Sequence, residues 1–293
     1  MSSLASGPNN LSWSKNAYLL LNGINLAHPM RQVLSWNCGA VYKPLFLLTR
    51  FSALLEKSPV LVQITGRQDA VYAQFVKHAA EEWGLLFSDA DFVTVLEHLR
   101  WLVEVDQPAG KSVLLNLSDP MTASALFGIY PAHTDNRLFG PLNEVYAPDV
   151  LAENWLQHVR KGSSVTPDRN TPYRLNDEQI AALDEAAFRL NVLELDKHMR
   201  EFFPDYLPAA SSRQRFDTLY DLARQAYDEG FRTQADIFHY ANVCHFLANE
   251  PEGAHPAITD LVRYKSALTP SQRIQQANWL IVEQERAAAG AQP

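Results

Sequence analysis

Short apolar runs alternate with amphipathic segments over the first half of the chain. The runs have the length of buried strands and lie at residues 18–21, 45–48, 60–64 and 85–87. Residues 70–83 have the apolar period of a helix with one buried face. Because continuous apolar strands are usually covered on both faces, we expect an α/β (α+β) N-terminal lobe in which a mixed sheet is flanked by helices.

Residues 83–120 carry the densest sequence of local signals. A strand at 83–88 is followed by a helix with apolar positions at 92, 95, 96 and 99, which Ser88 and Asp89 are placed to cap. Strands at 101–105 and 112–117 enclose a Pro- and Gly-containing turn at 107–110, which predicts a β-hairpin. Asp119-Pro120 then suits the start of another helix, with Asp as the cap and Pro in the first turn.

The second half of the chain predicts helices almost throughout. Cap signals occur as Asn176 with Gln179, Thr233 with Asp236, and Thr269 with Gln272. A further helix is expected at 213–229 with Gly230 after its end. These patterns predict five or six helices in an all-α C-terminal lobe.

Residues 157–174 interrupt every period with Gly, Ser and Pro, which indicates a linker. We therefore expect a flexible N-terminus at 1–16, an α/β domain at 17–156, a linker at 157–174 and a helical lobe at 175–293.

The composition narrows the class of protein. A formal net charge of −8 over 293 residues argues against nucleic-acid binding, which needs a dense basic surface. No apolar run reaches the roughly 20 residues of a membrane span, and residues 1–10 lack the pattern of a signal peptide. We expect a cytoplasmic protein in which Cys38 and Cys244 are reduced and buried.

Candidate catalytic and metal patterns favour structural explanations. Residues 109–112 have the end of a phosphate-binding loop but lie in the predicted hairpin turn. His239 and His245 are six residues apart on one helix, so they diverge, and Cys244 fits the buried stripe. Ser163 and Ser164 lack the strand of a nucleophile elbow. We expect neither a metal nor a cofactor.

Acidic and aromatic residues complete the candidates. Asp89 or Asp91 is expected to cap a helix, and Asp119 to start a turn or a helix, in preference to forming a catalytic pair. Trp83 and Trp101 are expected in the core. The runs that contain Phe202 and Trp279 are too apolar all round to be wholly buried, so they are expected to expose part of their surface.

The order of these motifs resembles a known family. The apolar run 17–21 ends in Asn22-Gly23, predicted strands follow at 43–49 and 60–65, and the next strand begins Trp83-Gly84 and ends at Ser88. Asp119-Pro120 closes the hairpin, and Phe139-Gly140-Pro141 follows. In this order they are similar to the type VI secretion effector chaperones, or effector adaptors, which load a toxin onto a VgrG-type spike protein. The chain departs from the family pattern at Asn22, Asn116 and Met121, where acidic or arginine residues are usual.

The resemblance implies a bacterial, non-enzymatic adaptor with a cognate effector and a VgrG-type protein as partners, and it leaves a co-chaperone open. We expect the effector to bind in an apolar groove between the lobes, with candidate contacts at Phe139, Phe202, Phe203, Tyr206 and Trp279.

Two alternatives stay open from the residues alone. One is a small-molecule enzyme with a pocket between the lobes that uses groups such as His133 and Asp135. The other is an interaction subunit of a different assembly.

Overall fold

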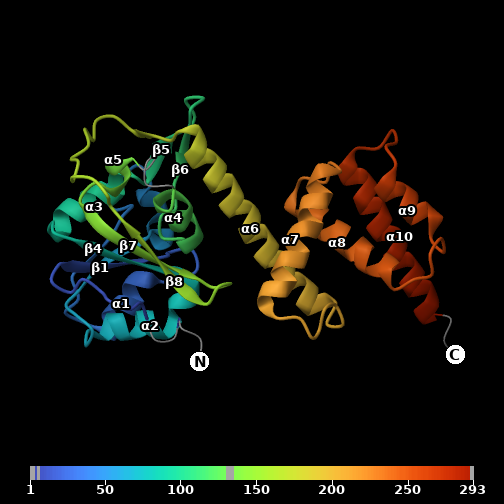
Figure 1. Cartoon of the computed structure of the whole chain (residues 1–293), viewed down its shortest axis with the longest axis horizontal. Helices are drawn as coiled ribbons and strands as arrows, with labels where there is room; N and C mark the ends of the chain where they lie inside the picture. The colour runs from blue at the N-terminus through green and yellow to red at the C-terminus, as the bar shows by residue number, and fades with distance from the viewer. Residues whose placement is uncertain (1–3, 5–6, 130–134, 291–293) are drawn as a thin grey trace. The chain divides into compact units, whose positions relative to one another are not determined.

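A computed structural model describes residues 4, 7–129 and 135–290 of the chain. The described chain divides into two units, residues 1–187 (unit 1) and 188–293 (unit 2). Figure 1 shows the order of the elements. The strands, all in unit 1, are β1 Asn16–Leu21, β2 Tyr42–Pro44, β3 Val60–Ile64, β4 Trp83–Ser88, β5 Glu104–Asp106, β6 Ser112–Leu114, β7 Leu142–Asp149, β8 Asn154–Val159 and β9 Tyr173–Arg174.

The helices of unit 1 are α1 Pro29–Trp36, the 3₁₀ helix η2 Ser52–Lys57, α2 Ala70–Glu82, α3 Phe92–Trp101, α4 Pro120–Phe127 and α5 Asn136–Phe139. Helix α6, Asp177–Phe202, begins in unit 1 and ends in unit 2. Unit 2 continues with α7 Ser212–Asp228, α8 Gln234–Ala248, α9 Pro256–Arg263 and α10 Pro270–Gly290.

Unit 1 is built on a six-stranded sheet with the order β2-β3-β1-β4-β7-β8. Every neighbouring pair in it is antiparallel. A second, three-stranded sheet has the order β6-β5-β9, and it holds the parallel pair, β5 with β9. The predicted fold class, a sheet lobe flanked by helices with a helical region after it, is confirmed.

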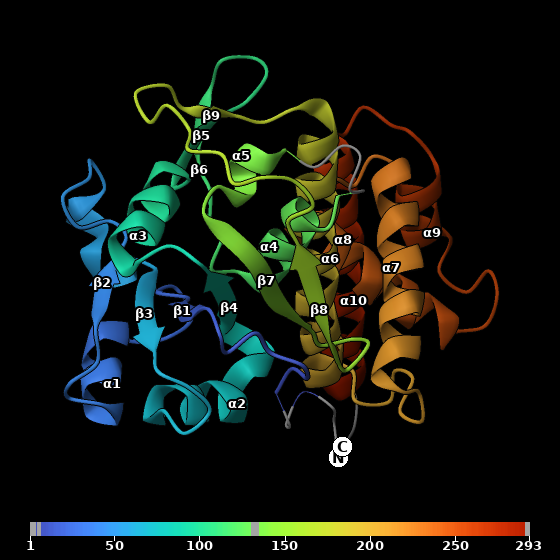
Figure 2. The same cartoon turned by 60° about the vertical axis from the view of Figure 1, so that its left-hand side comes forward.

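The central strand β1 feeds two separate cores. Its residues alternate between the faces of the sheet, as strand geometry requires: Tyr18 and Leu20 enter one core, and Leu19 and Leu21 enter the other. Helices α3 and α4 supply the first core, and α1 and α2 supply the second, so helices cover both faces (Figure 2). Burial on both faces of the sheet explains why the strand sequences are apolar at consecutive positions.

Three local predictions in unit 1 need correction. The strand predicted at 43–49 ends at Pro44, because Leu45 and Phe46 direct their N–H groups to Pro59 and the Ser58 hydroxyl. Helix α3 extends through residue 101, so the hairpin strands shorten to β5 and β6. Ser88 and Asp89 do not cap α3; the other expected cap, Asp91, is confirmed, because it accepts a hydrogen bond from the Thr94 N–H at 2.8 Å.

The predicted helix starts in the second half are confirmed. Asn176 and Gln179, and likewise Thr269 and Gln272, exchange side-chain and backbone hydrogen bonds. Thr233 forms the same reciprocal cap with Asp236 at the start of α8. Such pairs satisfy N–H groups that a helix leaves without partners. Asp119 caps α4 with a single hydrogen bond, which its carboxylate accepts from the Thr122 N–H at 2.7 Å.

The segments predicted to be flexible or linking are part of unit 1. In the predicted N-terminus, Trp13 packs edge-on against Tyr72 and Phe87. The segment at 157–174 completes β8 and supplies β9. The boundary between the units falls within α6, after the predicted linker.

Two side-chain predictions also turn out differently. Cys38 is exposed, because it lies in the loop after α1 and not in either core; Cys244 is half-buried. Trp101 is half-buried, so its predicted place in the core is confirmed in part: it packs against the first core and its indole donates to the Thr171 carbonyl. The side chain of Trp83 lies outside the described residues. None of the described helices is long and apolar enough to cross a membrane.

Candidate functional site

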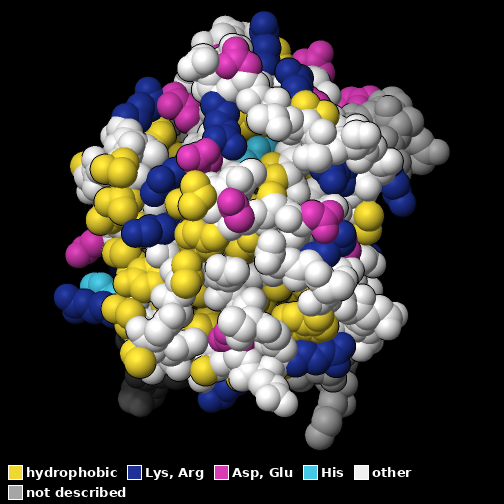
Figure 3. Space-filling model, turned by 90° about the vertical axis from the view of Figure 1, so that its left-hand side faces the viewer, with side chains coloured by type: hydrophobic (Ala, Val, Ile, Leu, Met, Phe, Trp, Pro, Cys, Tyr) yellow, Lys and Arg dark blue, Asp and Glu magenta, His cyan; other side chains and the backbone are white. Residues whose placement is uncertain are grey.

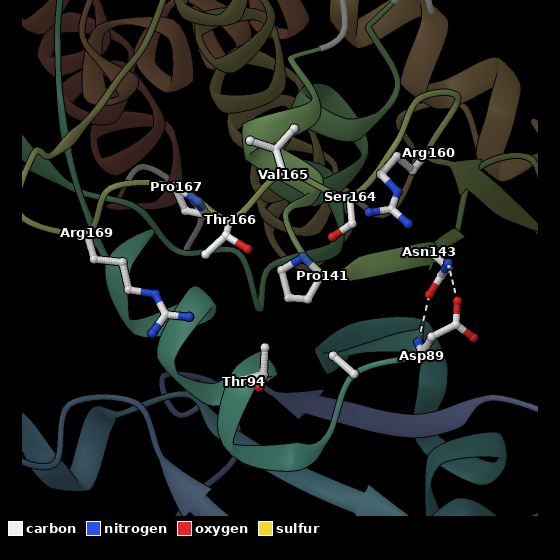
Figure 4. Close-up of a pocket in the computed structure, with 11 residues that line it drawn as sticks. Asp89, Thr94, Pro141, Asn143, Arg160, Ser164, Val165, Thr166, Pro167 and Arg169 are labelled. Carbon is white, nitrogen blue, oxygen red and sulfur yellow. Dashed lines mark hydrogen bonds between the residues drawn. The ribbon is translucent and has the colours of Figure 1, made fainter.

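A pocket of about 310 Å³, to which both polar and apolar side chains contribute, lies in unit 1 where α3 begins (Figure 4). Arg160 and Arg169 face it from opposite sides, with Thr94 and Pro141 between them. Arg169 pairs with Glu97, whereas Arg160 donates to the Gly140 carbonyl at 2.7 Å, and its Nε has no hydrogen-bond partner among the described residues.

The carboxylate of Asp89, which lines this pocket, already has hydrogen-bond partners within the chain. Asp89 exchanges two hydrogen bonds with Asn143, at 2.8 and 3.0 Å, and pairs with Lys15 at 2.8 Å. The hydrogen bond from Lys15 is the main cause that holds the pKa of Asp89 below its usual value. Ser164 donates to the Gly140 carbonyl at 3.0 Å, so its proton is not directed at a general base. The pocket suits hydrogen bonding to a polar group better than nucleophilic chemistry.

Gly140 is the point at which the elements around this pocket meet. Ser88 at the end of β4 donates to the Pro141 carbonyl at 2.7 Å, next to Gly140. Gly140 has a φ of 51°, and a Cβ there would lie 2.3 Å from the His98 ring. His98 is fully buried, with Nε2 2.9 Å from the Leu138 carbonyl. The chain therefore needs glycine at 140 for both its backbone angle and its close approach to α3.

Burial sets the protonation state of two histidines in unit 1. It lowers the pKa of His98 to about 4, and it lowers the pKa of His158 to about 4 as well. Both imidazoles are therefore neutral at pH 7, because protonation would place a poorly solvated charge at the fully buried His98 or at the half-buried His158.

In unit 2, three of the predicted contact residues come together. Phe202, at the end of α6, is 60% exposed, and its ring lies 4.8 Å from that of His198. Phe203 and Tyr206 both pack against His245, at ring distances of 4.7 and 5.6 Å. We call Phe202, Phe203 and Tyr206 the aromatic cluster; sequence reasoning found it because its members lie within five positions of one another.

The other two predicted contacts are placed elsewhere. Trp279 lies on α10 and is 58% exposed, which confirms that its apolar run reaches the surface. Phe139 is 1% exposed and packs edge-on against Phe127. In this conformation Phe139 is core and offers no surface to a partner.

A cavity of about 340 Å³ lies beside the aromatic cluster and is lined by Tyr206, Cys244 and His245, among others. Burial raises the pKa of the Cys244 thiol to about 11, so the thiol stays protonated and is a poor nucleophile. Burial also raises the pKa of Tyr206. These shifts leave neither group activated at pH 7.

The groups of the enzyme and metal alternatives are distributed as follows. Asp135 caps α5 by accepting from the Arg137 N–H, and His133 lies outside the described residues. Gly110, in the residues that resemble a phosphate-binding loop, has a φ of 80° in the predicted hairpin turn. No cluster of three metal-ligating side chains occurs within 7–129 and 135–290.

The sequence of the chain is similar to those of known proteins. Residues 17–135 match a family described as a domain of unknown function, DUF4123. The match spans 119 of the 293 residues, which is less than half of the chain. Proteins with this domain are effector adaptors of type VI secretion systems, so the resemblance read from the motifs is confirmed.

A curated relative extends the likeness beyond the DUF4123 domain. The chain is 28% identical over 279 residues to the accessory protein VasW of Vibrio cholerae serotype O1, an alignment that covers 94% of this chain and 90% of VasW. Because residues 17–135 account for less than half of that alignment, the sequence similarity extends over most of the helical unit. No solved structure gives a significant match.

Four of the motif positions named from the sequence hold elements of unit 1 together. Ser88 and Gly140 join β4 to the start of β7, and Asp119 with Pro120 starts α4. Gly84 pairs with Leu20 on β1, and a Cβ there would meet nothing closer than 4.0 Å. The pocket residues Asn143, Arg160 and Arg169 were not predicted, because the sheet order brings them together from separate segments and no local pattern marks them.

The first prediction concerns Gly140. Gly140→Ala should lower the free energy of unfolding of unit 1 by about 2–4 kcal/mol, since left-handed backbone and overlap with the His98 ring both oppose a Cβ. Gly110→Ala is the matched control: its φ is 80° but nothing lies within 4 Å, so it should cost only about 1–2 kcal/mol. Urea unfolding followed by tryptophan fluorescence measures both, and equal losses would contradict the role of the His98 contact.

The second prediction concerns pH. The folded-state pKa values of His98 and His158 lie below the unfolded value of 6.5, so the unfolded chain binds more protons between pH 6.5 and 4, and stability falls as the pH falls. Each histidine should contribute up to about 3 kcal/mol to this loss. His98→Gln keeps a donor for the Leu138 carbonyl and cannot be protonated, so its unfolding free energy should depend less on pH than that of the wild type. Parallel pH profiles for the two proteins would refute this assignment.

Proposed function

We propose that this protein is a non-enzymatic adaptor that binds a cognate type VI secretion effector in the bacterial cytoplasm and loads it onto a VgrG-type spike protein. The observation that carries the proposal is the DUF4123 domain, within a chain that aligns almost completely with an accessory protein. The likeness to these proteins supports a role in type VI secretion through protein partners.

The physical task of such an adaptor is to hold a client reversibly. Exposed aromatic rings suit this task, because they bury a large area with little loss of side-chain freedom and dominate contact energies. Phe202 supplies such a ring, and Phe203 and Tyr206 fix its surroundings through His198 and His245. We assign the effector to the aromatic cluster, with Trp279 as a separate exposed contact.

The third prediction tests this assignment. The tagged chain is co-expressed with the effector encoded beside its gene, and the effector recovered on the tag is quantified. Phe202→Ala should weaken binding about 30-fold, which is the effect of losing an aromatic hot spot. Because the ring is 60% exposed, its removal should leave the core intact. Trp279→Ala tests the second contact in the same way.

The control variant is Tyr264→Ala, since Tyr264 is 63% exposed and lies in unit 2 outside the aromatic cluster. It should retain full recovery. If Phe202→Ala and Trp279→Ala both recover as much effector as the wild type, the aromatic residues are not the binding site. If the wild type recovers no effector, the proposed function itself is wrong.

A further inference from the structure

Residues 22–58 of unit 1 display more large apolar side chains than a solvated surface needs. Five of them are between 44% and 88% exposed: Ile24, Leu34, Val41, Leu48 and Leu54. We call these five residues the β2-edge surface, because β2 is the outer strand of the six-stranded sheet on this side. Figure 3 shows hydrophobic side chains gathered over one half of this face of unit 1, with Lys and Arg side chains among them.

Backbone contacts bring three segments together at one end of this surface. The loop after β1 touches the end of η2, since a Cβ on Gly23 would lie 2.1 Å from the Ser58 carbonyl oxygen. The loop after β2 reaches the same residue, because the Phe46 N–H donates to the Ser58 hydroxyl at 2.9 Å. Ile24, Leu48 and Leu54 belong to these three segments. These three exposed side chains therefore come from segments that meet in one region of unit 1.

Leu48 is unfavourable in two independent ways. Its side chain is 88% exposed, and its φ is 64°, in the left-handed region that Gly and Asn occupy more readily. Apolar exposure and backbone strain both oppose leucine at this position in the isolated chain. Stability of the isolated fold therefore does not account for leucine at position 48.

The edge of β2 is poorly suited to pairing with an added strand. Pro44 has no N–H, and its carbonyl already accepts from the Arg100 guanidinium at 3.2 Å. The Val41 carbonyl accepts a hydrogen bond from the Gln63 N–H on β3, and the Leu45 N–H donates to the Pro59 carbonyl, so both groups are already used within the sheet. Docking on this surface therefore depends on side chains, as when an amphipathic helix lies on an apolar face.

The charge around the surface identifies the chemistry of the partner. Residues 22–58 hold four basic side chains and one acidic one, although the whole chain has a net charge of −8. Arg31, Lys43 and Lys57 are exposed, and Arg50 pairs with Glu104. Basic groups beside exposed apolar groups favour an acidic partner, because complementary charges steer the approach and exclude like-charged surfaces.

An adaptor that delivers one protein to another has to contact both at once. The aromatic cluster in unit 2 is assigned to the effector, so the second partner needs a surface of its own. We propose that the β2-edge surface binds an acidic amphipathic helix of that second partner, the spike protein. This inference rests on the proposed function and assigns one partner to each unit.

The experiment measures the affinity of the full chain for the VgrG-type protein and for the effector encoded beside its gene. Leu48→Asn should weaken spike binding at least tenfold and leave effector binding unchanged. Its urea midpoint should stay equal or rise, because Asn tolerates the left-handed backbone better than Leu. Lys43→Glu combined with Lys57→Glu should also weaken spike binding and reduce its dependence on salt.

Val150→Asn is the matched control, since Val150 is 47% exposed in a loop of unit 1 outside residues 22–58, and it should bind both partners normally. If Leu48→Asn fails to fold, Leu54→Gln tests the same surface. Unchanged spike affinity in the Leu48 and Leu54 variants overturns the inference while leaving the proposed function intact.

Other outcomes assign the surface to a different occupant and also overturn the inference. These are loss of effector binding in place of spike binding, loss of self-association, and loss of binding to vesicles of anionic phospholipid. If the wild type binds neither protein, the proposed function fails and the inference fails with it.

Discussion

Burial of both faces of one central strand is the constraint on which unit 1 depends. Along β1, adjacent side chains enter opposite cores, so a helical layer is required on each side of the sheet. Helix α3, on one side, is fixed further by the contact between His98 and Gly140.

A scaffold of this kind separates stability from recognition. The motif residues Ser88, Asp119 and Gly140 hold elements in place. The exposed groups assigned to partners lie outside these positions, at the end of α6, on α10 and in residues 22–58. A protein that acts by holding two others needs such displayed surfaces, and it needs no pair of titrating groups tuned for proton transfer.

The sequence predicted what short-range chemistry determines. Capping pairs such as Thr233 with Asp236 lie three residues apart, so both partners are visible in one window. The aromatic cluster was visible for the same reason. Features fixed by distant contacts were not: the strand at 43–49 stops early because Ser58 and Pro59 take its next N–H groups. Phe139 is core because Phe127, on another helix, covers it, and nothing in the local pattern marks Leu48 as left-handed.

The central claim is that this chain joins two proteins without chemistry of its own. Size-exclusion chromatography of the effector and the spike protein, mixed with and without the chain, tests it most directly. The account predicts that all three co-elute, and that effector and spike elute separately when the chain is omitted. Equal co-elution of effector and spike in its absence would contradict it.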